Sequence, residues 1–115
     1  MAEDKLYDLS ILNKISGGDE SFILEMINTF KETAPEYLDK AGSLLEKQSI
    51  DSLSKETHRF IPGVSFLGAK DLEYDLMKIE EFTKKHNNLN ELPQLLESVE
   101  QKINKLIASF NRDFK

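Results

Sequence analysis

The stretch from Ser49 to Ala69 reads SIDSLSKETHRFIPGVSFLGA and carries the clearest helical pattern of the chain. Apolar or small side chains recur in it at steps of four, three, four and three residues, which places them on one face of an α-helix. These positions are Leu53, Thr57, Phe60, Val64 and Leu67. Ser49 or Asp51 suits the beginning of this helix, and Gly68 suits its end. The stretch therefore predicts an amphipathic helix that packs its apolar face into a bundle.

Pro62 lies inside this predicted helix and cannot donate a hydrogen bond to the carbonyl of His58, four residues earlier. A proline in a helix interior typically costs ~3 kcal/mol. Because the apolar pattern continues beyond the proline as far as Leu67, we expect a bent but continuous helix rather than a turn at Pro62-Gly63.

The N-terminal half predicts three further helical segments. A short helix is expected from Leu9 to Ile15, where Gly17-Gly18 stops it. Asp19 is a good N-cap for a second helix. Pro35 is expected to break or bend that helix, and it suits the first turn of a third one that ends near Gln48.

The C-terminal part predicts two helices and no strand. One runs from about Lys70 to Lys85, and Asn87-Asn88 mark the turn that follows. Asn90 is expected to cap the last helix, with Pro93 in its first turn. Short connections between amphipathic helices favour antiparallel neighbours. Residues 1–115 are thus predicted to form one all-α domain, an antiparallel four-helix bundle with a short extra N-terminal helix across one end.

Composition narrows the classes of function. The chain has 115 residues, no cysteine and a formal net charge of −6. Lack of cysteine excludes disulfides and thiolate metal sites, and the negative charge argues against nucleic acid and membrane surfaces as partners. The N-terminal residues Met1–Lys5 lack the layout of a signal peptide, and no apolar run approaches the roughly 20 residues of a membrane span. We therefore expect a cytoplasmic monomer.

His58 is the polar residue with the most informative position. Each residue turns a helix by about 100°, so His58 lies on the flank of the buried stripe and faces partly outward. Its neighbours on the helical wheel are Ser54, Lys55, Ile61, Pro62 and Ser65. Several of these are small or flat, which leaves the imidazole accessible to a partner. Geometry alone still favours an ordinary surface histidine, and His86 is interpreted in that way.

The usual catalytic constellations are missing from the sequence. It contains no Glu-x-x-His pair, no HExxH motif and no glycine-rich phosphate loop, so it predicts neither a metal site nor an ATP site. The spread acidic residues, such as Asp71 and Glu80-Glu81, are expected to form a solvated face. Lys84-Lys85 fit the C-terminal end of a helix dipole.

The segment Thr57–Ala69 resembles the phosphorylation-site signature of histidine-containing phosphotransfer (Hpt) domains. It has a small residue before the histidine, an apolar residue two positions after it, and Leu-Gly-Ala at the end of the helix. The similarity to the family covers nearly the whole chain. It includes Gly17-Gly18-Asp19-Glu20, Phe22, Phe30 and Ala34-Pro35 upstream, and Leu72, Leu76 and Ile79-Glu80 downstream.

This resemblance implies a phosphocarrier without an ATP site of its own. His58 would accept a phosphoryl group from an aspartate of a receiver domain and pass it to another receiver. Its partners would be response-regulator receiver domains and in some pathways a hybrid histidine kinase. Mg²⁺ would belong to the receiver, so no cofactor is expected here. The residues expected to support or dock around the site are Ser54, Lys55, Arg59, Ile61, Pro62, Gly63, Ser65 and Phe66.

The motif departs from the family pattern at two positions. Many Hpt domains have a lysine three residues after the histidine, where this chain has Ile61, and often a glycine next, where it has Pro62. Lys55, on the other flank of His58, is expected to supply part of the missing charge. Two alternatives stay open: a bundle that only binds proteins, and a phosphatase that acts through His58 alone.

Overall fold

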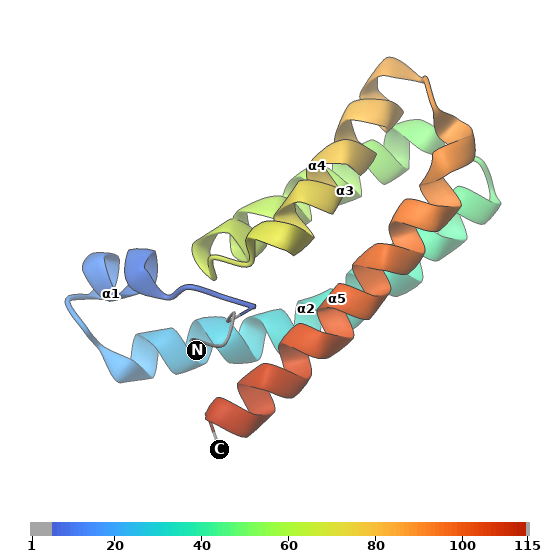
Figure 1. Cartoon of the computed structure of the whole chain (residues 1–115). Coiled ribbons are helices and arrows are strands. Elements are labelled where there is room, and N and C mark those ends of the chain that lie inside the picture. The colour runs from blue at the N-terminus through green and yellow to red at the C-terminus, as the bar shows by residue number, and fades with distance from the viewer. Residues whose placement is uncertain (1–5, 115) are drawn as a thin grey trace, which may run out of the picture.

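Helices make up all the regular secondary structure of residues 6–114, which are the part of the chain that the computed structural model describes (Figure 1). Residues Met1–Lys5, which lack the layout of a signal peptide, and residue 115 lie outside this part. The elements are α1 (Ser10–Ser16), α2 (Glu20–Glu46), α3 (Ile50–Phe66), α4 (Lys70–Lys85), the 3₁₀ turn η1 (Leu89–Glu91) and α5 (Leu92–Asp113). The prediction of an all-α bundle with a short extra N-terminal helix is confirmed.

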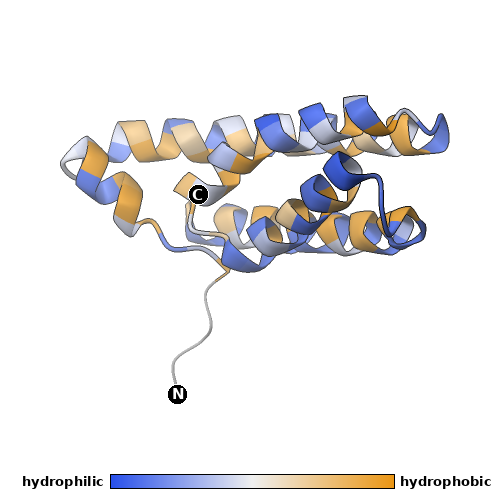
Figure 2. Cartoon of the chain, turned by 90° about the horizontal axis from the view of Figure 1, so that it is seen from above, coloured by the Kyte–Doolittle hydropathy of each residue, from blue (hydrophilic) through white to orange (hydrophobic). Residues whose placement is uncertain are grey.

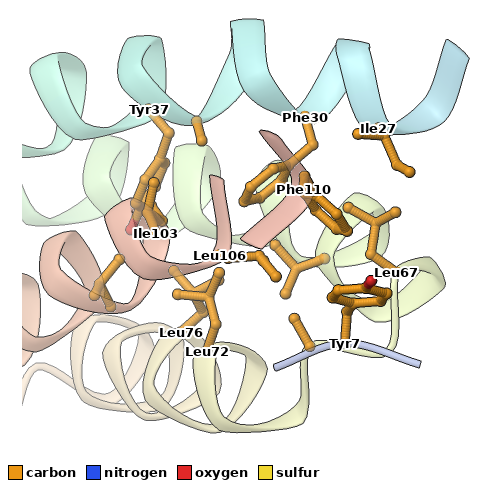
Figure 3. Close-up of a cluster of buried hydrophobic side chains, with 14 of the residues drawn as sticks. Tyr7, Ile27, Phe30, Tyr37, Leu67, Leu72, Leu76, Ile103, Leu106 and Phe110 are labelled. Carbon is orange, nitrogen blue, oxygen red and sulfur yellow. The ribbon is translucent and has the colours of Figure 1, made fainter. Parts of the chain in front are cut away.

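Each long helix contacts two others, in the order α2–α3–α4–α5 and back to α2, so the four close around one core. Apolar and hydrophilic positions alternate along the helices, as the hydropathy colouring in Figure 2 shows, and many of the apolar side chains are buried in the core. The close-up in Figure 3 shows side chains from α2, α4 and α5 meeting at the centre. Burying each large apolar side chain contributes about 1.5–3 kcal/mol. The helices therefore hold one another by their apolar stripes.

Pro35 does not divide α2, which is a single helix of 27 residues. The expectation of a break and a separate third helix was therefore wrong. Pro35 is exposed, whereas Phe30, Ala34 and Tyr37 on the opposite side of the helix are buried. Burying Phe30 and Tyr37, at ~1.5–3 kcal/mol each, matches or exceeds the ~3 kcal/mol cost of the proline.

The predicted continuity of α3 through Pro62 is confirmed, and this proline is also exposed. Ser49 occupies the N-cap position, although its side chain makes no capping hydrogen bond. Gly68 follows the end of the helix with a φ of 65°, the left-handed conformation that favours glycine. The helix that carries His58 therefore begins and ends where the sequence predicts.

The predicted cap at Asn90 is wrong. Asn90 lies within the 3₁₀ turn η1, and Glu91 occupies the N-cap position of α5. The backbone at Asn90 is already in the 3₁₀ conformation. A capping residue needs an extended backbone, so Asn90 cannot cap α5. Pro93 does lie in the first turn of α5, and Asp19 caps α2 by accepting from the backbone N–H of Ser21.

The segment before α1 is fastened to the end of the bundle. The backbone N–H of Asp8 donates to the carbonyl of Leu67 at 3.0 Å. Tyr7 is buried against Phe110, with ring centroids 4.7 Å apart (Figure 3), and its hydroxyl bonds to Asp113. These contacts hold α1 across one end of the bundle. No helix within residues 6–114 is long and apolar enough to cross a membrane.

Candidate functional site

His58 lies in the middle of α3, and its side chain is 72% exposed. Thr57, the residue before it, is completely buried, so the backbone at this point is fixed by the core while the imidazole faces outward. The position on the flank of the apolar stripe is the one that the sequence predicts. A rigid helix therefore presents an accessible histidine.

Glu80 on α4 is the partner of this histidine. Its Oε2 accepts a hydrogen bond from Nδ1 of His58, across the antiparallel pair of α3 and α4. The Glu80 side chain is only 18% exposed, so the expectation that it belongs to a solvated face was wrong. The apolar stripe of α4 lies next to Glu80 and holds it between the helices, because Leu76, Ile79 and Thr83 are all buried.

The hydrogen bond from His58 to Glu80 decides which ring nitrogen is available. An ionised carboxylate can only accept, so Nδ1 is the donor. In the neutral imidazole the other nitrogen, Nε2, then has a lone pair and no proton. The arrangement therefore orients a nucleophilic nitrogen in an exposed ring.

An open depression of about 560 Å³ surrounds the imidazole. It is lined by Asp51, Ser54, Lys55, His58, Arg59, Glu80 and Lys84. Asp51 accepts a hydrogen bond from Nε2 of His86 at 2.8 Å, and Glu80 is bonded to His58. Both acidic residues of the depression are thus engaged by histidines, and the remaining charges are cationic.

A buried polar and aromatic group supports α3 from behind. The hydroxyls of Tyr37 and Thr57 lie 2.8 Å apart, and burial raises the pKa of Tyr37 to about 12. The ring of Phe60 stacks on Tyr37 at 4.5 Å and lies 6.0 Å from Phe30. The sequence indicated Phe60 as part of the stripe but gave no sign that Tyr37 bonds to the residue beside His58.

The Hpt domain family matches residues 25–109. This range covers most of the chain and includes His58, Glu80 and all four long helices in whole or in part. The chain belongs to the Hpt domain family.

A solved structure gives the same fold. It is the crystal structure of histidine-containing phosphotransfer protein B (HptB) from Pseudomonas aeruginosa PAO1, with a TM-score of 0.86 and 22% sequence identity over 96% of each chain. No curated protein matches the chain. As an Hpt domain, the chain has a histidine phosphotransfer role in phosphorelays, with two-component proteins such as receiver domains as its partners.

The residues predicted to dock around the site of this Hpt domain all lie on α3. The exposed ones are Lys55, Arg59, Pro62, Gly63 and Phe66, and the partly buried ones are Ser54, Ile61 and Ser65. Phe66 is 41% exposed, which is unusual for an aromatic side chain. Ile61 packs against the edge of the core. His86 is exposed and bonds to Asp51, away from the stripe of the core.

Proposed function

We propose that His58 is the phosphorylated residue, and that it accepts a phosphoryl group from the aspartyl phosphate of one receiver domain and passes it to another. The observation that carries this proposal is the hydrogen bond from Nδ1 of the exposed His58 to Glu80. It leaves Nε2 as the nucleophile. Membership of the Hpt family supports a phosphotransfer role for this histidine.

The chemistry needs few groups on this chain. The lone pair of Nε2 attacks the phosphorus, the N–P bond forms, and the P–O bond to the receiver aspartate breaks so that the carboxylate leaves. The ring keeps its proton on Nδ1 and becomes positively charged. The carboxylate of Glu80 offsets that charge, and the reverse reaction regenerates the neutral imidazole. Phosphoryl transfer depends mainly on positioning and charge stabilisation. Mg²⁺ on the receiver would stabilise the charge on the phosphoryl oxygens.

The proposed docking face centres on His58 and includes Lys55, Pro62, Ser65 and Phe66. An exposed aromatic such as Phe66 beside a reactive residue is suited to anchor a partner. Chemical-shift mapping with a receiver domain tests this face. Shifts that cluster instead on α5, around Glu97 to Lys105, contradict it.

A labelling experiment tests the proposed function. Receiver domains charged with acetyl phosphate and Mg²⁺ are incubated with the wild type, His58→Gln and His86→Gln, and acid-labile, base-stable phosphate is detected on each. His86 is a matched control because it is also exposed and bonded to a carboxylate. We expect label on the wild type and His86→Gln and none on His58→Gln. Binding without label indicates a pure interaction module, and release of inorganic phosphate indicates a phosphatase; either result refutes the proposal.

A further inference from the structure

The depression beside His58 contains more positive charge than the motif of α3 provides. Ile61 occupies the position of the usual lysine and packs against the core. Because its side chain is apolar, it offers no charge to a phosphoryl group. Lys55 and Arg59 of α3 and Lys84 of α4 nevertheless line the same depression as the imidazole. In a chain with a net charge of −6, this is a local concentration of cations.

Two of these cations have no carboxylate at ion-pair distance among residues 6–114. These are Lys55 and Lys84, whereas Arg59 is 3.7 Å from Glu56. Lys85, next to Lys84 in the sequence, is 3.3 Å from Glu81. The ammonium groups of Lys55 and Lys84 therefore remain available to an anion that arrives in the depression.

Their positions place them on opposite walls of the depression. Lys55 precedes His58 by nearly one turn of α3, and Lys84 follows Glu80 by about one turn of α4. Glu80 occupies Nδ1 of the imidazole. Nε2 is therefore the ring nitrogen left to carry a phosphoryl group, and the imidazole lines the same depression as the two lysines.

We propose that Lys84, together with Lys55, binds the oxygens of the phosphoryl group on His58 and so takes the place of the lysine that Ile61 replaces. This inference rests on the proposed function, since it concerns the phosphorylated form. A phosphoryl group carries nearly two negative charges, and a lysine ammonium acts on it as a compact point charge. The single cation that many relatives have on α3 is here replaced by two, Lys84 of the neighbouring helix and Lys55 of α3 itself.

The test loads the domain chemically, so that it does not depend on a receiver. Phosphoramidate transfers its phosphoryl group to an exposed imidazole and releases ammonia, and all proteins carry His86→Gln so that only His58 is labelled. The decay of phosphohistidine is then followed at low salt in the otherwise unchanged protein and in Lys84→Ala, Lys55→Ala, Lys84→Arg and Lys85→Ala. Lys85 is the matched control, because it is adjacent and exposed but paired with Glu81.

We expect Lys84→Ala and Lys55→Ala each to shorten the lifetime about threefold, an effect of the size that exposed charge pairs produce. Lys84→Arg and Lys85→Ala should decay at the parent rate, and high salt should remove the differences. Adding Ile61→Lys to Lys84→Ala should restore the lifetime. If Lys84→Ala decays no faster than Lys85→Ala at low salt, the inference is wrong even where receivers label His58. Failure of receivers to label a protein that shows the Lys84 effect would instead refute only the proposed function.

Discussion

The hydroxyl oxygen of Tyr37 on α2 lies 2.8 Å from that of Thr57 on α3, immediately before His58 in the sequence. Both side chains are buried, so this hydrogen bond joins the two helices inside the core. The residue before the reactive histidine is thus held in place by the core. Positioning of this kind favours phosphoryl transfer, which demands alignment more than acid–base chemistry.

Removal of either hydroxyl should destabilise the domain. Tyr37→Phe and Thr57→Val are each expected to lower the free energy of unfolding by about 1–3 kcal/mol, because the remaining hydroxyl is left buried without this partner. The double variant should cost clearly less than the sum of the two, since no orphaned group remains. Urea denaturation of the wild type, the two single variants and the double variant measures the four free energies of unfolding. Strict additivity would show that the two hydroxyls do not interact.

Alkaline pH should destabilise the protein through its buried tyrosines. Burial raises the pKa of Tyr37 from 10.0 to about 12, and burial beside Asp113 raises that of Tyr7 to about 12. The unfolded chain therefore loses these protons first, and stability falls as the pH rises from about 10 to about 12. Tyr37→Phe should lose less stability than the wild type between about pH 9 and about pH 11. Equal losses in the two proteins would contradict this assignment.

Gly68→Ala should be strongly destabilising. Gly68 has a φ of 65°, and a Cβ added there would lie 2.7 Å from the amide nitrogen of Asp8 and still closer to its carbonyl oxygen. Gly17 is a matched control, since its φ is 66° and nothing lies near its Cβ position. Thermal unfolding should show a loss of about 1 kcal/mol for Gly17→Ala from backbone strain and at least about 2 kcal/mol for Gly68→Ala. Equal losses of stability in the two variants would mean that Asp8 can move away from the added Cβ at little cost.

Glu80→Ala should slow phosphoryl transfer without preventing it. Without the carboxylate, the proton of His58 is shared between Nδ1 and Nε2, and the ring is less well oriented. We expect a rate loss on the order of tenfold, because a misplaced nucleophile reacts poorly. Nitrogen NMR of the His58 ring should show protonated Nδ1 in the wild type and a mixture in Glu80→Ala. Glu81→Gln, a change at an exposed neighbour, should leave both the rate and the spectrum unchanged.

Periodicity predicted nearly all of the fold. The helix from Lys70 to Lys85 has the predicted bounds, and the stripe from Leu53 to Leu67 is the buried face of α3. The error at Pro35 has a physical cause. A proline in the sequence indicates only its local free-energy cost to the helix. The stabilisation from packing a continuous α2 against α3 and α5 comes from residues far away in the sequence.

The site was predictable only where it depends on a single helix. The flank position of His58 follows from the turn of one helix, so sequence alone was enough to find it. Its bond to Glu80 spans 22 positions and depends on the register between α3 and α4, which the pattern of neither helix determines. The same register brings Lys84 into the depression. The hydroxyl bond from Tyr37 likewise requires the packing of α2 on α3.

The contact between Tyr7 and Asp113 joins positions that are 106 residues apart. Contacts of such high sequence separation form late in folding, because the chain must first pay the entropy of closing the loop between them. The bundle from α2 to α5 can assemble through neighbours in the sequence, whereas the contacts of Tyr7 with Phe110 and Asp113 can form only after α5 is in place. We therefore expect the amide hydrogens of α1 to exchange with solvent much sooner than those at the centre of α3, where His58 lies. Opening of this end can then occur while the reactive helix remains folded.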